Sequence, residues 1–277
     1  MRPDAEARQV PERAAEPTRR PIRLGGAWLG SVGYTGLSIA ALLALWDLLV
    51  RIWEVPIWLL PKPSDFIGRL FTDWLLIAEH AWATSSTVVM GFALGVAVAI
   101  PLALLIVSVA ALERGLYPVI VFLNIMPKTV IGPILIVWFG IGPLVSVLIV
   151  FLMCFFPVLV DSMSGFRVVD RRLFYITRSM GASPWQSFRY VRLPASMRYV
   201  YAGMKIGIVK AVEGVIIAEF IASEAGLGYL IMRASSFMDM TLMFSGLIAT
   251  AIVALMFNGA LSAAERLLMP WARFDHG

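Results

Sequence analysis

The stretch DRRLFYITRSMGASPWQSFRYVRLPASMRY, residues 170–199, is a polar segment within an otherwise apolar sequence. Its pattern predicts two short helices joined by a sharp turn. Gly181 fits the position just after a helix, where a left-handed residue ends it. Ser183 and Gln186 have the spacing of a capping box for the second helix, which we expect Pro194 to end. Membrane-crossing segments flank the pair, so we interpret it as a docking element on the membrane surface.

The composition indicates a membrane protein. The chain has 277 residues, of which 60% are hydrophobic, and its mean hydropathy is +0.83. About twenty apolar residues cross a bilayer. Gly91 and Gly95 form a small-xxx-small pattern that favours close helix packing. Cys154 is the only cysteine, so an internal disulfide and a cysteine-based metal cage are excluded. It lies in an apolar run. The sequence therefore predicts an all-α integral membrane protein with about six transmembrane helices, at roughly 31–50, 83–107, 116–139, 144–160, 203–222 and 242–262.

Basic residues predict the orientation in the membrane. The loop at 161–205 contains seven arginines and one lysine, against Asp161 and Asp170. Lysine and arginine are enriched in loops on the cytoplasmic side of a membrane. We therefore expect this loop and both chain termini to lie in the cytoplasm.

Polar residues within the predicted spans mark a candidate translocation pathway. Pro127 must break or kink the third span, and Lys128 follows it at membrane depth. Alternatively, Lys128 reaches the membrane surface or pairs with a neighbouring carbonyl. In the fifth span, Lys210 and Glu213 lie three residues apart and can pair on one helix face. Glu219 lies further along that span and needs another partner or water.

Three separated motifs resemble those of one known family. GAS, LP and AGMK, at 181–183, 193–194 and 202–205, resemble the EAA loop of permease subunits of binding-protein-dependent ABC transporters. Two further stretches resemble the nitrate, sulfonate and taurine branch of that family, namely MPKTVIGPILIVWFGIG at 126–142 and AEFIASEAGLGYLI at 218–231. Tyr175, Ile176 and Thr177 stand where the family has an acidic residue followed by two alanines.

The resemblance implies a type I ABC importer permease fold. Its permease domain would cover 80–265 and include a cytoplasmic coupling loop at 161–202. Residues 1–24 would be a disordered cytoplasmic tail. Residues 25–79 would form a first transmembrane helix and a periplasmic amphipathic segment, and residues 266–277 would be a C-terminal cytoplasmic tail. The loop would dock into a separate ATPase through Arg178, Gly181, Ala182, Ser183, Leu193 and Pro194.

The resemblance also implies partners and a solute class. Two copies of the chain would act with two cytoplasmic ABC ATPase subunits and an external solute-binding protein, in the bacterial plasma (inner) membrane. ATP and Mg would bind the ATPase subunits, and this chain would bind no cofactor. The expected solute is a small anion such as an aliphatic sulfonate, taurine or nitrate. A pyrimidine precursor of thiamine, or another small organic solute, is the alternative.

The sequence contains no catalytic signature. GxxxxGK[ST], HExxH and GxSxG are all absent, so we expect a non-catalytic permease with no metal site. A secondary transporter driven by an ion gradient is a competing interpretation, with the intramembrane charges as its relay. A membrane-anchored DNA-binding protein would use 170–193 as a helix-turn-helix. Both ends of that segment are tethered to membrane spans, so we expect no nucleic acid partner.

Overall fold

The computed structural model describes residues 24–169, 175–177 and 179–269. Every regular element in these residues is helical, which confirms the predicted all-α class. The elements are α1 (Leu24–Ile52), α2 (Pro63–Thr72), α3 (Trp74–Ser108), α4 (Ala110–Ile125), a 3-10 turn (Lys128–Val130), α5 (Ile131–Phe139), α6 (Pro143–Val168), α8 (Pro184–Ser187), a π-helical segment (Phe188–Arg192), α9 (Leu193–Ala222), α10 (Leu227–Ser236) and α11 (Met240–Leu268).

Among the described residues, three helices are long and apolar enough to cross a membrane, and these are α3, α6 and α11. Taken together, α4 and Lys128–Phe139 are also apolar enough, and the bend of 79° between them fits either one broken span or a re-entrant loop. α1 and α9 cover the first and fifth predicted spans. The charges on α9 make it less apolar than the other spans, since it carries Lys205, Lys210, Glu213 and Glu219.

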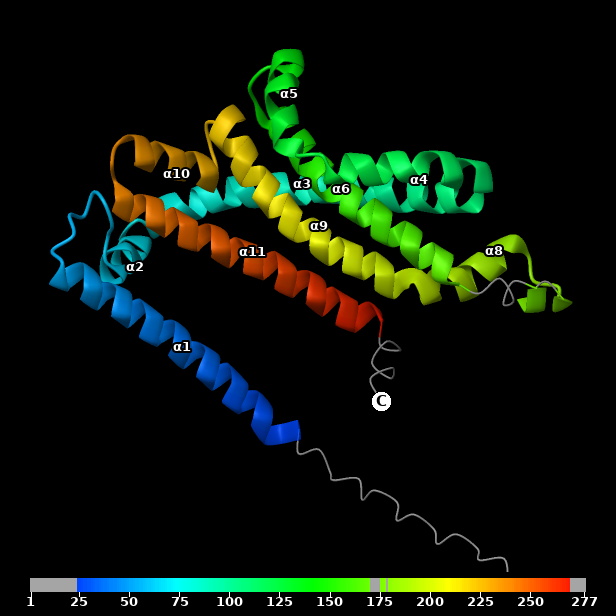
Figure 1. Ribbon diagram of the computed structural model, residues 1–277, viewed down its shortest axis with the longest axis horizontal. Helices are drawn as coiled ribbons and strands as arrows, with labels where there is room; N and C mark the ends of the chain where they lie inside the picture. Colours follow the sequence, from blue (N-terminus) through cyan, green and yellow to red (C-terminus); the bar gives the residue numbers. More distant parts are fainter. Residues whose placement is uncertain (1–23, 170–174, 178, 270–277) are drawn as a thin grey trace, which may run out of the picture.

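The helix α6 lies at the centre of the bundle, with α3 and α9 packed along it (Figure 1). Glycines allow this close packing. A Cβ atom on Gly91 would lie 2.5 Å from Val150 Cγ1, and one on Gly95 would lie closer still to the Cys154 thiol. Gly207 of α9 makes a similar approach to α6, with 2.8 Å to the nearest side-chain carbon. The predicted close packing at Gly91 and Gly95 is therefore confirmed, and Gly207 makes a second close glycine contact with α6.

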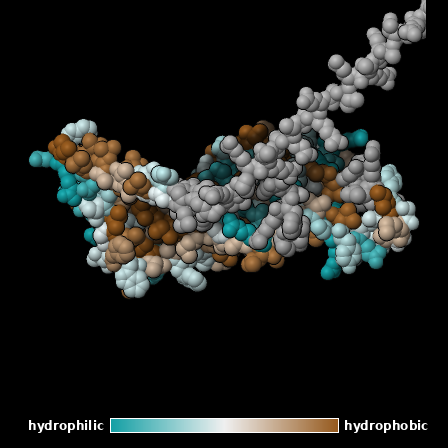
Figure 2. Space-filling view, turned by 90° about the horizontal axis from the view of Figure 1, so that it is seen from below, coloured by the Kyte–Doolittle hydropathy of each residue, from teal (hydrophilic) through white to brown (hydrophobic). Residues whose placement is uncertain are grey.

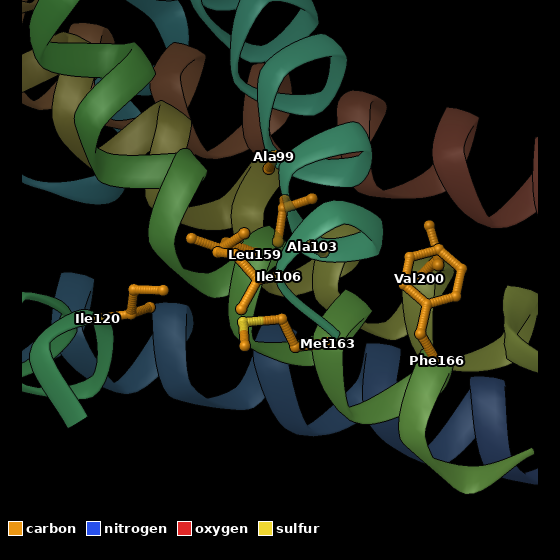
Figure 3. Packing of buried hydrophobic residues seen from close by; sticks show 9 residues of the cluster. Ala99, Ala103, Ile106, Ile120, Leu159, Met163, Phe166 and Val200 are labelled. Atoms are coloured by element: carbon orange, nitrogen blue, oxygen red, sulfur yellow. The ribbon is translucent and has the colours of Figure 1, made fainter. Parts of the chain in front are cut away.

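One hydrophobic cluster joins α3, α4, α6 and α9 near the end of the bundle where α6 leads into the loop. Figure 3 shows Ile106 of α3 beside Leu159 and Met163 of α6. In a membrane, such contacts stabilise the bundle by van der Waals packing rather than by removal of apolar surface from water. The buried members are Ala99, Ala103, Ile106, Ile120, Val158, Leu159, Met163, Phe166 and Val200.

Large apolar side chains are exposed over much of the surface (Figure 2). Val137 is 82% exposed, Leu267 80% and Trp82 77%. Soluble monomers rarely expose contiguous apolar patches beyond a few hundred Å². A lipid environment, with further protein contacts in an assembly, accounts for such a surface.

The helix α1 lies apart from the other long helices for most of its length (Figure 1). It contacts the body through its last turns, where the Trp46 ring lies 5.6 Å from the rings of both Phe66 and Phe244. The Ser64 hydroxyl of α2 donates to the Asp47 carboxylate of α1 at 2.8 Å. These contacts tie the first helix to α2 and α11.

Candidate functional site

The turn predicted at Gly181 is confirmed. Gly181 has φ of +79°, and the Ala182 N–H donates to the Thr177 carbonyl at 3.0 Å, a bond that ends the preceding helix. The capping box is present in both directions. The Ser183 N–H donates to Gln186 Oε1 at 2.8 Å, and the Gln186 N–H donates to Ser183 Oγ at 3.2 Å. Among the described residues, helical structure before the turn and α8 after it therefore meet at a sharp glycine turn.

The prediction that Pro194 ends the second loop helix is wrong. Helical structure runs on from α8 through the π-helical segment Phe188–Arg192 into α9, and Pro194 lies in the first turn of α9. Proline has no N–H, and its ring crowds the carbonyl four residues earlier. In the π-helical segment, the Leu193 N–H bonds instead to the Phe188 carbonyl five residues back. This wider turn accommodates the proline, so the loop is joined directly to α9.

The loop carries an exposed set of large side chains, which we call the loop's apolar surface. Its members are Tyr175 (73% exposed), Ile176 (54%), Met180 (79%), Trp185 (64%) and Tyr190 (72%). They come from both sides of the Gly181 turn. The predicted docking residue Arg178 lies outside the described residues. A surface of this kind is a natural binding face for a partner protein.

Two arginines attach the loop to the helical bundle. Arg192 donates to the Phe166 carbonyl and to Ser108 Oγ, both at 3.4 Å. Arg167 at the end of α6 pairs with Glu113 of α4 at 2.5 Å. Burial lowers the pKa of the Arg192 guanidinium below its ordinary value, and the Glu113 charge opposes that shift. The loop is thus linked to α3, α4 and α6 as well as to α9.

The break predicted at Pro127 is present, between α4 and the 3-10 turn. Lys128 is half-buried there. Its ammonium donates to the Asn124 carbonyl at 2.6 Å and lies 5.3 Å from the centroid of the Phe156 ring. The alternative prediction for Lys128, pairing with a neighbouring carbonyl, is therefore confirmed. A role in solute passage stays a prediction.

The predicted pair on α9 is confirmed, because Lys210 Nζ lies 2.7 Å from Glu213 Oε2. Both side chains are about half exposed, at 46% and 49%. They therefore lie on a face of the chain that a solute or a second subunit can reach.

Glu219 is separated from that pair and is 3% exposed. Its carboxylate accepts hydrogen bonds from the Thr84 hydroxyl at 2.8 Å and from the Gly228 N–H at 2.7 Å. Thr84 in turn accepts from the Leu227 N–H at 2.8 Å. The hydrogen-bonding partners of Glu219, which the sequence left open, thus come from α3 and α10. The carboxylate therefore joins α9, which carries it, to these two helices.

The glycines of the GLGYLI motif make room for that carboxylate. Gly226 has φ of +106°, and a Cβ atom there would overlap the Glu219 carboxyl group, 2.2 Å from its Cδ. A Cβ on Gly228 would lie 2.8 Å from Glu219 Cβ. His80 Nδ1 accepts from the Gly226 N–H at 3.1 Å. The role of Thr84 was not predicted, because no sequence pattern around it indicates one. The two glycines that follow Glu219, Gly226 and Gly228, do indicate that the backbone approaches another group closely there.

Within the part of the chain that the structure describes, no three His, Cys, Asp or Glu side chains gather into a possible metal site. The functional side chains described above instead either hydrogen-bond one helix to another or form the loop's apolar surface.

Comparison with known proteins agrees with the resemblance seen in the motifs. Residues 91–274 match the family described as "Binding-protein-dependent transport system inner membrane component". The chain is 31% identical over 237 residues to the riboflavin transport system permease protein RibX of Chloroflexus aurantiacus, covering 85% of this chain and 88% of that protein. It is 28% identical over 275 residues to the putative aliphatic sulfonates transport permease protein SsuC of Bacillus subtilis, covering 98% of each.

The fold is also similar to a solved structure, that of the MetNI methionine ABC transporter in an inward-facing conformation. The TM-score is 0.61 at 18% sequence identity, covering 70% of this chain and 96% of that one. At this identity the likeness concerns the fold alone.

Proposed function

Since the chain belongs to the family of binding-protein-dependent transport system inner membrane components and is a permease subunit of an ABC importer, we propose that it carries a small anion, such as an aliphatic sulfonate, taurine or nitrate. The observation that carries this choice of solute is the alignment with SsuC, named as a putative aliphatic sulfonates permease, which covers 98% of each chain.

A second candidate solute class is a larger neutral organic molecule, such as a thiamine-precursor pyrimidine. The similarity to RibX favours it, because that protein is named as a riboflavin permease. Two lysines favour the anion. Lys128 lies at the break after α4, and Lys210 lies on the exposed face of α9 beside Glu213. These three side chains together carry two positive charges and one negative charge, which attracts an anion.

The loop's apolar surface is proposed to bury itself in a groove of a cytoplasmic ATPase subunit. Two copies of this chain would form the pathway, and two ATPase subunits would hold the two loops. Closure of the ATPase pair would then draw the loops together. Because α8 continues through the π-helical segment into α9, this motion would pass directly to the helix that carries Lys210 and Glu213.

The remaining parts of the assembly follow the same proposal. ATP and Mg would bind the ATPase subunits, and this chain would supply no catalytic group. An external binding protein would deliver the solute at the end of the bundle opposite the loop. Both termini would lie in the cytoplasm, on the side of the arginine-rich loop, as the distribution of basic residues favours.

Uptake in whole cells tests the solute. Cells lacking the chain should lose growth on an alkanesulfonate or taurine as sulfur source, or growth on nitrate as nitrogen source, and regain it with the intact chain. As a matched comparison, solute uptake by Lys128→Met is measured against uptake by the intact chain, with both proteins present in the membrane in equal amounts. Loss of riboflavin or pyrimidine uptake with normal sulfonate and nitrate uptake would favour the second candidate.

Energy supply tests the class of transporter. In vesicles, solute movement should require the ATPase subunits and ATP, and should survive collapse of ion gradients. Movement driven by a proton or sodium gradient in the absence of any ATPase would favour the secondary transporter instead.

A further inference from the structure

A cavity of about 340 Å³ lies where α3 and α6 end and the coupling loop leads into α9. This volume is at the lower end of the range of small-molecule sites. The helix α3 ends at Ser108 and α6 ends at Val168, so the cavity lies level with the ends of two apolar helices. A site at this level faces the headgroup layer of a bilayer rather than its hydrocarbon core.

The described part of the cavity wall carries a net positive charge. The guanidiniums of Arg167 and Arg192 stand against one carboxylate, that of Glu113. Arg167 Nε pairs with Glu113 at 2.5 Å, so this carboxylate compensates one of the two positive charges. At this wall Arg192 donates to neutral oxygen atoms, those of the Phe166 carbonyl and the Ser108 hydroxyl. The three charged side chains together leave one positive charge, which an anion would compensate.

The two guanidiniums are oriented to receive an anion. A guanidinium carries several N–H donors in a planar fork that fits two oxygen atoms of a phosphate. The bonds of Arg192 at this wall are both 3.4 Å, longer than the usual range of about 2.7–3.2 Å, so a charged oxygen would form shorter ones. The Cζ atom of Arg167 lies 4.1 Å from the centroid of the Tyr117 ring, which holds its guanidinium in place.

Apolar side chains lie in the same wall and next to it. Val107, Phe166 and Val169 line the cavity. Leu105 of α3 and Leu112 of α4, in the turns on either side of the junction of these helices, are 55% and 37% exposed. An inorganic anion gains little from such a surface, whereas the hydrocarbon of a lipid packs against it. The combination of charge and apolar surface favours an anion that carries hydrocarbon chains.

We propose that this cavity binds the phosphodiester headgroup of an anionic phospholipid such as phosphatidylglycerol. Basic pockets between membrane helices are suited to such headgroups. The headgroup of phosphatidylglycerol carries one negative charge, which matches the one positive charge of the described wall. Because Arg192 ends the π-helical segment that leads from the loop into α9, a bound headgroup fastens the loop to the membrane surface. The site is separate from the proposed solute pathway and does not depend on it.

The test measures Kd by isothermal titration calorimetry on the purified full chain, freed of lipid in a neutral detergent. The probes are dihexanoylphosphatidylglycerol, dihexanoylphosphatidylcholine and inorganic phosphate. The phosphatidylglycerol should bind about tenfold more tightly than the phosphatidylcholine, because the choline cancels the headgroup charge. It should also bind about tenfold more tightly than inorganic phosphate, because burial of two methylene groups contributes about that factor.

Two changes of charge in the wall should shift this affinity in opposite directions. Arg192→Gln removes a positive charge and should weaken phosphatidylglycerol binding about tenfold. Glu113→Gln removes the negative charge but keeps an acceptor for Arg167, and should strengthen binding by a similar factor. The matched control is Arg189→Gln in the same π-helical segment. Arg189 is exposed and lies outside the cavity, so this change should alter Kd by less than about twofold.

Several results would overturn the proposal. These are no binding of the phosphatidylglycerol, equal affinity for the phosphatidylcholine, and shifts in the same direction for Arg192→Gln and Glu113→Gln. Inorganic phosphate that binds as tightly as the lipid would also overturn it, since the site would then take a free anion. If Arg192→Gln does not fold, the Glu113→Gln result and the three probes still decide. Loss of the ATPase partner with normal lipid binding would refute the proposed function and leave this site standing.

Discussion

Replacing Gly226 with alanine should damage this protein far more than the same change at Gly181. Both glycines have positive φ, +106° and +79°. A residue with a side chain loses about 1–2 kcal/mol in the left-handed region. Gly226, with φ of +106° and ψ of 165°, lies in a region that is essentially restricted to glycine, so the backbone cost there is at least as large. Any further difference must come from the surroundings.

The surroundings differ sharply. A Cβ on Gly181 would meet nothing within 4 Å, whereas one on Gly226 would lie 2.2 Å from Glu219 Cδ. The carboxylate would have to move and would lose its bonds from Thr84 and Gly228. Each hydrogen bond to a charged group contributes about 1.5–3 kcal/mol. The expected cost is therefore about 4–8 kcal/mol at Gly226 and about 1–2 kcal/mol at Gly181.

Thermal unfolding of the purified variants in one detergent measures the difference. A cost of 1 kcal/mol lowers Tm by about 2–4 °C in a chain of this size class. Gly181→Ala should unfold a few degrees below the native chain, and Gly226→Ala more than about 10 °C below it. The double variant Gly226→Ala/Glu219→Ala relieves the clash, so its Tm loss should be well below the sum of the single losses. Equal Tm losses for the two glycine variants would refute the role given to Glu219.

Three further perturbations test other parts of the structure. Gly91→Ala should destabilise the chain by about 1–3 kcal/mol, because its Cβ would overlap α6, whereas Gly115→Ala on α4 meets no neighbour and should leave Tm unchanged or slightly raised. Ser183→Ala removes half of the capping box and should cost the loop helix about 1 kcal/mol, seen as faster amide exchange in α8 with unchanged exchange in α6. Lys128→Met should slow uptake of the anionic solute at unchanged ATPase binding, and normal uptake would remove Lys128 from the pathway.

Local features of the site were predictable from sequence because their chemistry is local. The capping box between Ser183 and Gln186 needs residues only three apart. The Gly181 turn depends on the conformational freedom of one residue. Lys210 and Glu213 share a helix face by spacing alone. All three features are present as predicted, and so is the break at Pro127.

Features that depend on tertiary packing were not predictable. Thr84 and Glu219 are 135 residues apart in the chain, and a threonine in an apolar span signals nothing by itself. Pro194 was expected to end a helix, but the π-helical segment before it supplies the extra backbone space that a simple proline rule leaves out. The contacts of Arg192 with Ser108 and Phe166 likewise appear only once α3, α6 and the loop are assembled.

The most direct test of the central claim is purification of the tagged chain from its native membrane in mild detergent, with quantification of the subunits recovered. An ABC ATPase subunit should be recovered in stoichiometric amount. The double variant Met180→Glu/Trp185→Glu, which places charges on the loop's apolar surface, should lose it while Gly115→Ala retains it. Recovery of the chain alone, still moving solute in vesicles without ATP, would contradict the claim that this loop couples the permease to an ATPase.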